Sequence, residues 1–115
     1  MEITYGAIAI FGMVAIMGMY LLSLILRNKG TPKAVTLIHG LFAGLGLLLL
    51  IVYCLGNQTG PLVSIVIFCL AALSGVILNY KDLTGKKVPK WLAIVHGLVA
   101  MIGFAFLLVF AFSPS

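Results

Sequence analysis

Four long apolar stretches make up nearly the whole chain, and short polar segments separate them. The stretches run over residues 5–26, 33–55, 61–80 and 90–112. Each is long enough to cross the hydrocarbon core of a bilayer, which takes about 20 helical residues. The breaks carry Gly, Pro, Asn and Thr, which favour turns, and connections this short join antiparallel neighbours. The pattern therefore predicts an all-α four-helix bundle that forms a single transmembrane domain over residues 1–115.

The apolar pattern also occurs twice. Residues 32–46 read PKAVTLIHGLFAGLG and residues 89–103 read PKWLAIVHGLVAMIG, an offset of 57 positions. Residues 31–53 carry nine identities with their counterparts at this offset, and weaker matches extend through the first and third helices. We therefore expect two tandem two-helix repeats, about 1–57 and 58–115, related by a pseudo-two-fold axis along the membrane normal.

Composition favours a membrane location. The chain is 63% hydrophobic and 8% charged, with a mean hydropathy of +1.30. This is far more apolar surface than a soluble domain of this length could bury. No nucleotide-binding, Ser-His-Asp or zinc-protease motif is present. Any site must therefore be built from membrane helices or their ends.

Charge then predicts the orientation. All seven Lys and Arg lie in or beside the first and third connections, over residues 27–33 and 81–90. The positive-inside rule places these two loops in the cytoplasm and both chain ends outside. The net charge of +5 is explained by this topology and by contact with the lipid bilayer, so it requires no nucleic-acid partner. We expect the cytoplasmic membrane of a bacterium.

The candidate chemistry lies at His39 and His96, the only two histidines of the chain. Ionisable side chains inside apolar segments are costly and usually functional. Each histidine lies seven residues after a proline, Pro32 or Pro89. Proline suits the first turn of a helix. Seven residues span roughly 10 Å of helix. The two histidines are therefore expected at one depth, in the cytoplasmic half of the membrane.

Small residues accompany each histidine on its predicted helix face. Positions i+4 and i+7 share a face with i, and a further glycine comes directly after each histidine. Two more glycines lie at a similar depth on the other helices. Close helix packing accounts for such residues, but they also leave room for a planar ligand. The set comprises Gly40, Ala43 and Gly46, then Gly97, Ala100 and Gly103, and finally Gly18 and Gly75.

A haem held between two imidazoles fits this arrangement, because two helices related by a two-fold axis supply one axial ligand to each face of the ring. Lys33 and Lys90 begin the two histidine helices and could pair with haem propionates at the cytoplasmic surface. The positive-inside rule also explains these lysines without any ligand.

On His39, His96, their neighbouring glycines and the four-span layout, the chain resembles the small four-helix membrane b-type cytochromes. It departs from the cytochrome b561 pattern, which uses four ligand histidines for two haems. The resemblance implies one haem b per chain, with His39 and His96 as the iron ligands. It also implies electron exchange with a quinol or a redox partner protein, and it leaves a homo-oligomer open.

Two other functions stay open. A small proton- or metal-coupled transporter or channel could use the two imidazoles. Two histidines alone make a poor metal site, however, and the only acids are Glu2 at the terminus and Asp82, which we expect in a loop. A structural assembly subunit would use the histidines only as hydrogen-bonding contacts between helices.

Overall fold

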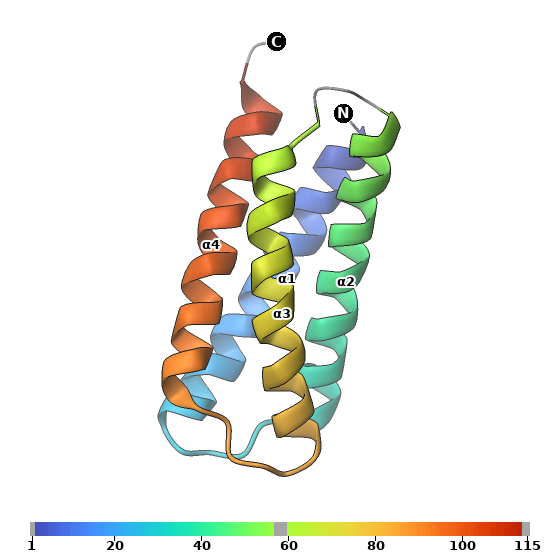
Figure 1. Cartoon of the computed structure of the whole chain (residues 1–115). Helices are drawn as coiled ribbons and strands as arrows, with labels where there is room; N and C mark the ends of the chain where they lie inside the picture. Colours follow the sequence, from blue (N-terminus) through green and yellow to red (C-terminus); the bar gives the residue numbers. More distant parts are fainter. Residues whose placement is uncertain (1, 57–59, 114–115) are drawn as a thin grey trace.

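Four helices account for most of the chain. A computed structural model describes residues 2–56 and 60–113. Its helices run in the order α1 (Glu2–Leu26), α2 (Lys33–Gly56), α3 (Leu62–Leu83) and α4 (Lys90–Phe112) (Figure 1). No strand occurs among the described residues, so the predicted all-α class is confirmed. The predicted second connection includes residues 57–59, which lie outside the described residues, as do Met1 and residues 114–115.

The helix boundaries follow the proline positions that the sequence indicated. Pro61 and Pro89 are the N-caps of α3 and α4, and α2 starts directly after Pro32. α3 continues to Leu83, three residues beyond the end expected for the third span at about residue 80. Asp82 is therefore part of a helix, where the sequence placed it in a loop.

α1 and α3 end in the same way. Asn28 (φ 58°) and Gly85 (φ 75°) adopt the left-handed conformation. The backbone N–H of Lys29 donates to Leu24 at 2.8 Å, and that of Lys86 donates to Lys81 at 2.8 Å. These are the contacts of a Schellman motif, which satisfies carbonyl groups at a helix end. The left-handed turn, rather than the charged Lys81 or Asp82, thus ends α3.

Each helix packs against two neighbours and faces the third helix across the centre. α1 and α3 both contact α2 and α4, so α2 and α4 are diagonal partners (Figure 1). The Cα positions extend over 45 × 19 × 19 Å. This arrangement lets side chains from α2 and α4 meet at the bundle axis.

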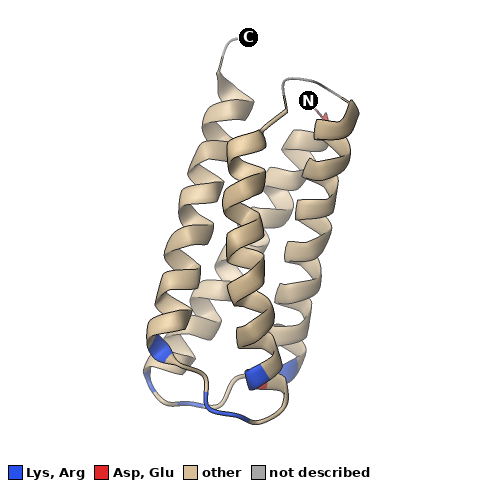
Figure 2. Cartoon of the chain, viewed as in Figure 1, with Lys and Arg blue, Asp and Glu red and all other residues tan. Residues whose placement is uncertain are grey.

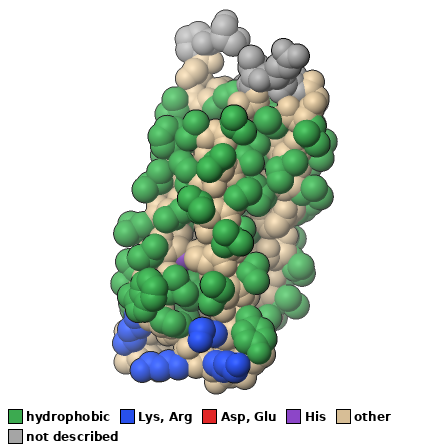
Figure 3. Space-filling view, in the orientation of Figure 1, with side chains coloured by type: hydrophobic (Ala, Val, Ile, Leu, Met, Phe, Trp, Pro, Cys, Tyr) green, Lys and Arg blue, Asp and Glu red, His purple; other side chains and the backbone are tan. Residues whose placement is uncertain are grey.

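The positively charged residues lie at one end of the bundle. Lys and Arg gather at the two connections over residues 27–32 and 84–89 and at the helix ends beside them, which we call the basic end (Figure 2). Large hydrophobic side chains cover the sides (Figure 3). All four helices are long and apolar enough to cross a membrane. A buried cluster away from the basic end contains Ala7, Phe11, Leu50, Ile65, Phe68 and Leu107.

Candidate functional site

His39 lies on α2 and is oriented by the backbone of α1. Its Nδ1 is 3.0 Å from the carbonyl oxygen of Val14. A carbonyl oxygen can only accept a hydrogen bond, so in the neutral ring we assign the proton to Nδ1 and the lone pair to Nε2. The contact fixes both the direction of the ring and its tautomer.

His96 on α4 is held in the same way by α3. Its Nδ1 is 2.8 Å from the carbonyl oxygen of Ala71 and 3.0 Å from Oγ of Ser74. Ser74 donates its own hydroxyl to Ala71 at 2.8 Å, which leaves its oxygen free to accept from the imidazole. The two accepting carbonyls, of Val14 and Ala71, are themselves 57 positions apart.

The two imidazoles face each other across the bundle axis. Their ring centroids are 6.4 Å apart and their planes cross at 77°. Among the described residues, no hydrogen bond reaches Nε2 of either ring. Each histidine therefore offers one unpaired ring nitrogen near the centre of the bundle.

A cavity of about 290 Å³ surrounds the pair, in the half of the bundle nearer the basic end. It is not sealed from the sides. Figure 3 shows part of a histidine side chain between hydrophobic side chains on the face in view. Eight of the twelve candidate residues from the sequence line the cavity: His39, Gly40, Ala43, His96, Gly97, Ala100, Gly18 and Gly75.

Gly18 and Gly75 leave room for the imidazoles. A Cβ on Gly18 would lie 2.9 Å from Cε1 of His39, and a Cβ on Gly75 would lie 3.0 Å from Cε1 of His96. Both distances are shorter than normal carbon–carbon contacts of about 3.5–4.0 Å. These two glycines on α1 and α3 thus permit the ring positions on α2 and α4.

Gly46 and Gly103 have a different role from the one expected. They do not line the cavity. A Cβ on Gly46 would lie 3.0 Å from the ring of Phe11, and a Cβ on Gly103 would lie 3.1–3.2 Å from the ring of Phe68. The two rings stack with centroids 4.1 Å apart and planes 7° from parallel. Room at the two glycines lets the aromatic pair close the cavity on the side away from the basic end.

The lysines are also placed differently from the expectation. Lys33 and Lys90 are absent from the cavity lining. Nζ of Lys33 lies 2.8 Å from Oδ1 of Asp82, in an ion pair within the bundle. The predicted equivalence of the two lysines therefore does not extend to their contacts.

Asp82 is the principal polar residue that the sequence analysis misplaced. It is 9% exposed and lines the cavity that contains both histidines. Thr31 and Thr36 each donate a hydroxyl to it at 2.6 Å, in addition to the contact from Lys33. Its spacing from Gly75, seven residues earlier on α3, was the available signal that it faces inward.

The protein ligand set is small. Among the described residues, no group of three or more His, Cys, Asp or Glu could hold a metal ion. No protein-family model, curated protein or solved structure matches the chain. The function is therefore inferred from the geometry of this site.

Proposed function

We propose that the chain is an integral membrane protein that binds one haem b between His39 and His96 and carries electrons. The observation that carries this proposal is the histidine pair. Two imidazoles from diagonal helices lie at a centroid distance of 6.4 Å, each with Nδ1 on a backbone carbonyl and with no hydrogen bond to Nε2 from the part of the chain that the structure describes.

The membrane topology follows from the helices and the charges. Four helices are long and apolar enough to span, and the Lys and Arg gather at one end (Figure 2). By the positive-inside rule, the basic end faces the cytoplasm and both chain ends face outward. The histidine pair then lies in the cytoplasmic half of the membrane.

Two tandem copies of a helix pair account for the symmetry of the contacts. In α2 the buried residues are Thr36, Gly46 and Leu50, and in α4 the positions 57 residues later, Ala93, Gly103 and Leu107, are buried. Contacts obey the same offset: Val14 and Ala71 accept from the histidines, and Phe11 stacks on Phe68. A pseudo-two-fold axis along the bundle explains all of these pairs together.

The donor set fits a haem iron. His39 and His96, whose ring centroids are 6.4 Å apart, would hold the iron through Nε2. Histidines that bind metals usually donate their other N–H to a carbonyl or carboxylate, as both do here. Two protein ligands are too few for most bare metal ions, whereas a macrocycle supplies the remaining ligands itself. The cavity of about 290 Å³ is just below the usual volume of ligand pockets, about 300–1,000 Å³.

The residues of the chain would set the chemistry of such a site. When bound, the haem would exchange one electron between its ferric and ferrous states. With both His39 and His96 bound to the iron, the site would carry electrons rather than bind a substrate. Val14 and Ala71 keep the protons on Nδ1, and the stacked Phe11 and Phe68 exclude water from the side away from the basic end. A quinol or a reduced redox protein would supply the electron, and a quinone or an oxidised redox protein would accept it.

Absorption spectra test the proposal. The protein is purified from haem-replete cells, and oxidised and dithionite-reduced spectra are recorded for wild type, His39→Ala, His96→Ala and the control Gly12→Ala. A Cβ at Gly12 meets no atom within 4 Å. We expect a low-spin haem spectrum at one haem per chain in wild type and control, lost or changed in both histidine variants. A colourless wild type, or histidine variants with an unchanged spectrum, would refute it.

A proton- or cation-coupled carrier is the second candidate, and Asp82 favours it. A buried carboxylate in the same cavity as two imidazoles provides titratable groups within the helices. The contacts from Thr31, Lys33 and Thr36 hold this carboxylate in place, however, which suits an anchor better than a mobile proton site. Flux in liposomes that depends on pH and disappears in Asp82→Asn, with no haem bound, would favour the carrier.

A further inference from the structure

The two lysines that begin α2 and α4 have different surroundings. Lys33 pairs with Asp82 at 2.8 Å. Position 25 corresponds to position 82 at the offset of 57, and Ile25 on α1 carries no charge. The only other acid of the chain is Glu2, at the far end of α1. The protein therefore supplies a carboxylate to Lys33 and none to Lys90.

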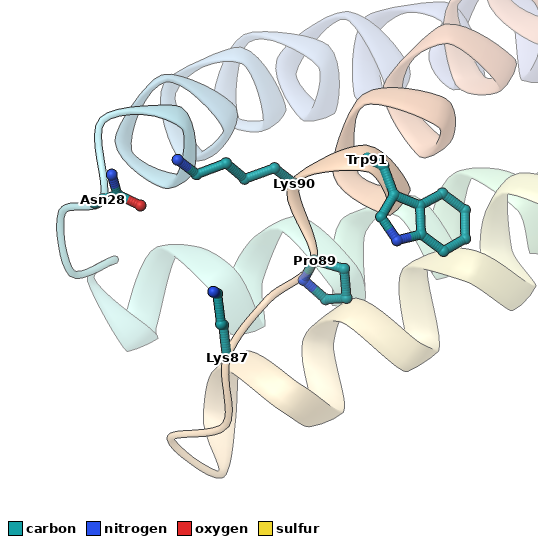
Figure 4. Close-up of a pocket in the computed structure, with 5 residues that line it drawn as sticks. All are labelled: Asn28, Lys87, Pro89, Lys90 and Trp91. Atoms are coloured by element: carbon teal, nitrogen blue, oxygen red, sulfur yellow. The ribbon is translucent and has the colours of Figure 1, made fainter.

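A surface pocket lies beside Lys90, which has no carboxylate partner. Its volume is about 470 Å³, and it is lined by Asn28, Lys87, Pro89, Lys90 and Trp91. In Figure 4 the polar ends of Asn28, Lys87 and Lys90 face a common space beside Pro89, and Trp91 lies on the other side of the proline ring. Two ammonium groups and an amide without an acidic partner make a site for an anion.

The position of the pocket indicates which anion. The pocket lies at the basic end of a bundle whose helices are long enough to span a membrane. Trp91 is 67% exposed there, and exposed tryptophans prefer the membrane interface. Basic side chains at a membrane surface attract anionic headgroups. A lipid phosphate offers charge to the lysines and an apolar portion to Pro89 and Trp91.

We propose that this pocket binds the phosphate of an anionic phospholipid from the leaflet at the basic end. Lys87 and Lys90 contact the phosphate and Asn28 donates its amide. Trp91 and Pro89 pack against the glycerol and upper acyl region. The lipid phosphate takes the place beside Lys90 that the Asp82 carboxylate takes beside Lys33. The site is separate from the histidine pair and does not depend on haem binding.

Trp91 provides the measurement, because it is the only tryptophan in the chain. Purified protein in detergent micelles is titrated with phosphatidylglycerol brominated on its acyl chains, and quenching of Trp91 fluorescence gives the affinity. Brominated phosphatidylcholine tests for a lipid without net charge. Inorganic phosphate, added as a competitor, tests for a free-phosphate site. Native mass spectrometry counts the bound lipid independently.

The matched control removes one charge from the same end of the bundle. Lys86 lies outside the pocket, with Nζ 4.8 Å from the ring centroid of Tyr80. We expect Lys87→Gln and Lys90→Gln each to weaken phosphatidylglycerol binding about five-fold, and Lys86→Gln to have little effect. Circular dichroism tests whether the three substitutions leave the helices intact.

Three results would overturn the proposal. An equal loss in Lys86→Gln would mean that only the general positive field attracts the lipid. Equal affinity for phosphatidylcholine would mean that Lys87 and Lys90 do not select charge. Full competition by millimolar inorganic phosphate would identify a free-phosphate site. None of these results changes the haem spectrum, so they are distinguishable from failure of the proposed function.

Discussion

Gly40 and Gly97 offer the sharpest test of the cavity, because they are matched in sequence and different in their surroundings. Each directly follows a histidine, and they are 57 positions apart. A Cβ on Gly40 would collide with Nδ2 of Asn79 on α3, whereas a Cβ on Gly97 would meet no atom within 4 Å. Position 22 corresponds to Asn79 at this offset and is a leucine. We expect Gly40→Ala to destabilise the bundle and Gly97→Ala to be neutral or stabilising.

The magnitude follows from two contributions. Alanine favours a helix over glycine by about 0.5–1 kcal/mol, and this gain is common to both variants, so it cancels in their comparison. The collision occurs only at Gly40. Inserting a methyl group into a packed site costs about 1–3 kcal/mol, while moving a side chain off its preferred rotamer costs about 0.5–1.5 kcal/mol. Since Asn79 can rotate, we expect Gly40→Ala to be about 1–2 kcal/mol less stable than Gly97→Ala.

Unfolding in mixed micelles measures this difference. Both variants are titrated with dodecyl sulfate in a non-ionic detergent, and helix content is followed by circular dichroism. The same pair is then made in an Asn79→Ala background, where the colliding amide is absent. The difference should shrink to near zero there. Equal stability of the two variants, or a difference that persists without Asn79, would refute the packing of α2 against α3 described above.

Gly18→Ala should disturb the histidine site while Gly12→Ala should not, because only the first Cβ meets an imidazole, at 2.9 Å from Cε1 of His39. The imidazole NMR signals of His39 should shift only in Gly18→Ala, and similar spectra for the two variants would contradict the ring position. Asp82→Asn should lower the free energy of unfolding by about 1–3 kcal/mol, since it removes the charge that three neighbouring donors share. Glu2→Gln removes the only other acid of the chain from an exposed position, so an equal effect on thermal unfolding would show that the contacts of Asp82 are unimportant.

The helices were predictable because their determinants are local. Apolar runs of twenty or more residues, prolines at helix starts and short turn segments are all visible in the sequence without any tertiary contact. The end of α3 was not found, because Lys81 and Asp82 look like loop residues when only polarity is considered. Their place is decided by the left-handed turn at Gly85 and by tertiary partners such as Thr36 on α2.

The site was predictable in outline for a different reason. The sequence pattern repeats at one offset, so two positions with equal spacing could be expected on diagonal helices before any contact was known. The carbonyl partners, Val14 and Ala71, could not be predicted, because a residue of any type can supply a backbone carbonyl. The inward-facing Phe11 and Phe68 were also missed. In a helix that is apolar on all sides, an apolar residue does not indicate which face points into the bundle.

The two halves of the bundle share the backbone contact of each histidine but differ in the polar residues of α3. On α3 the polar residues Ser74, Asn79 and Asp82 occupy positions that correspond to Met17, Leu22 and Ile25 on α1. Asn79 and Asp82 line the cavity, so its wall is polar on the α3 side, while the α1 side at the same level is apolar. A planar ligand on a two-fold axis can bind in two orientations. The two orientations are equivalent when the walls of the cavity are identical, and they differ in affinity when the walls differ. The polar wall removes this equivalence, because a ligand with one polar edge finds hydrogen-bonding groups on α3 alone. If the proposed haem binds between the two imidazoles, the polar wall on α3 would therefore favour one of its two orientations.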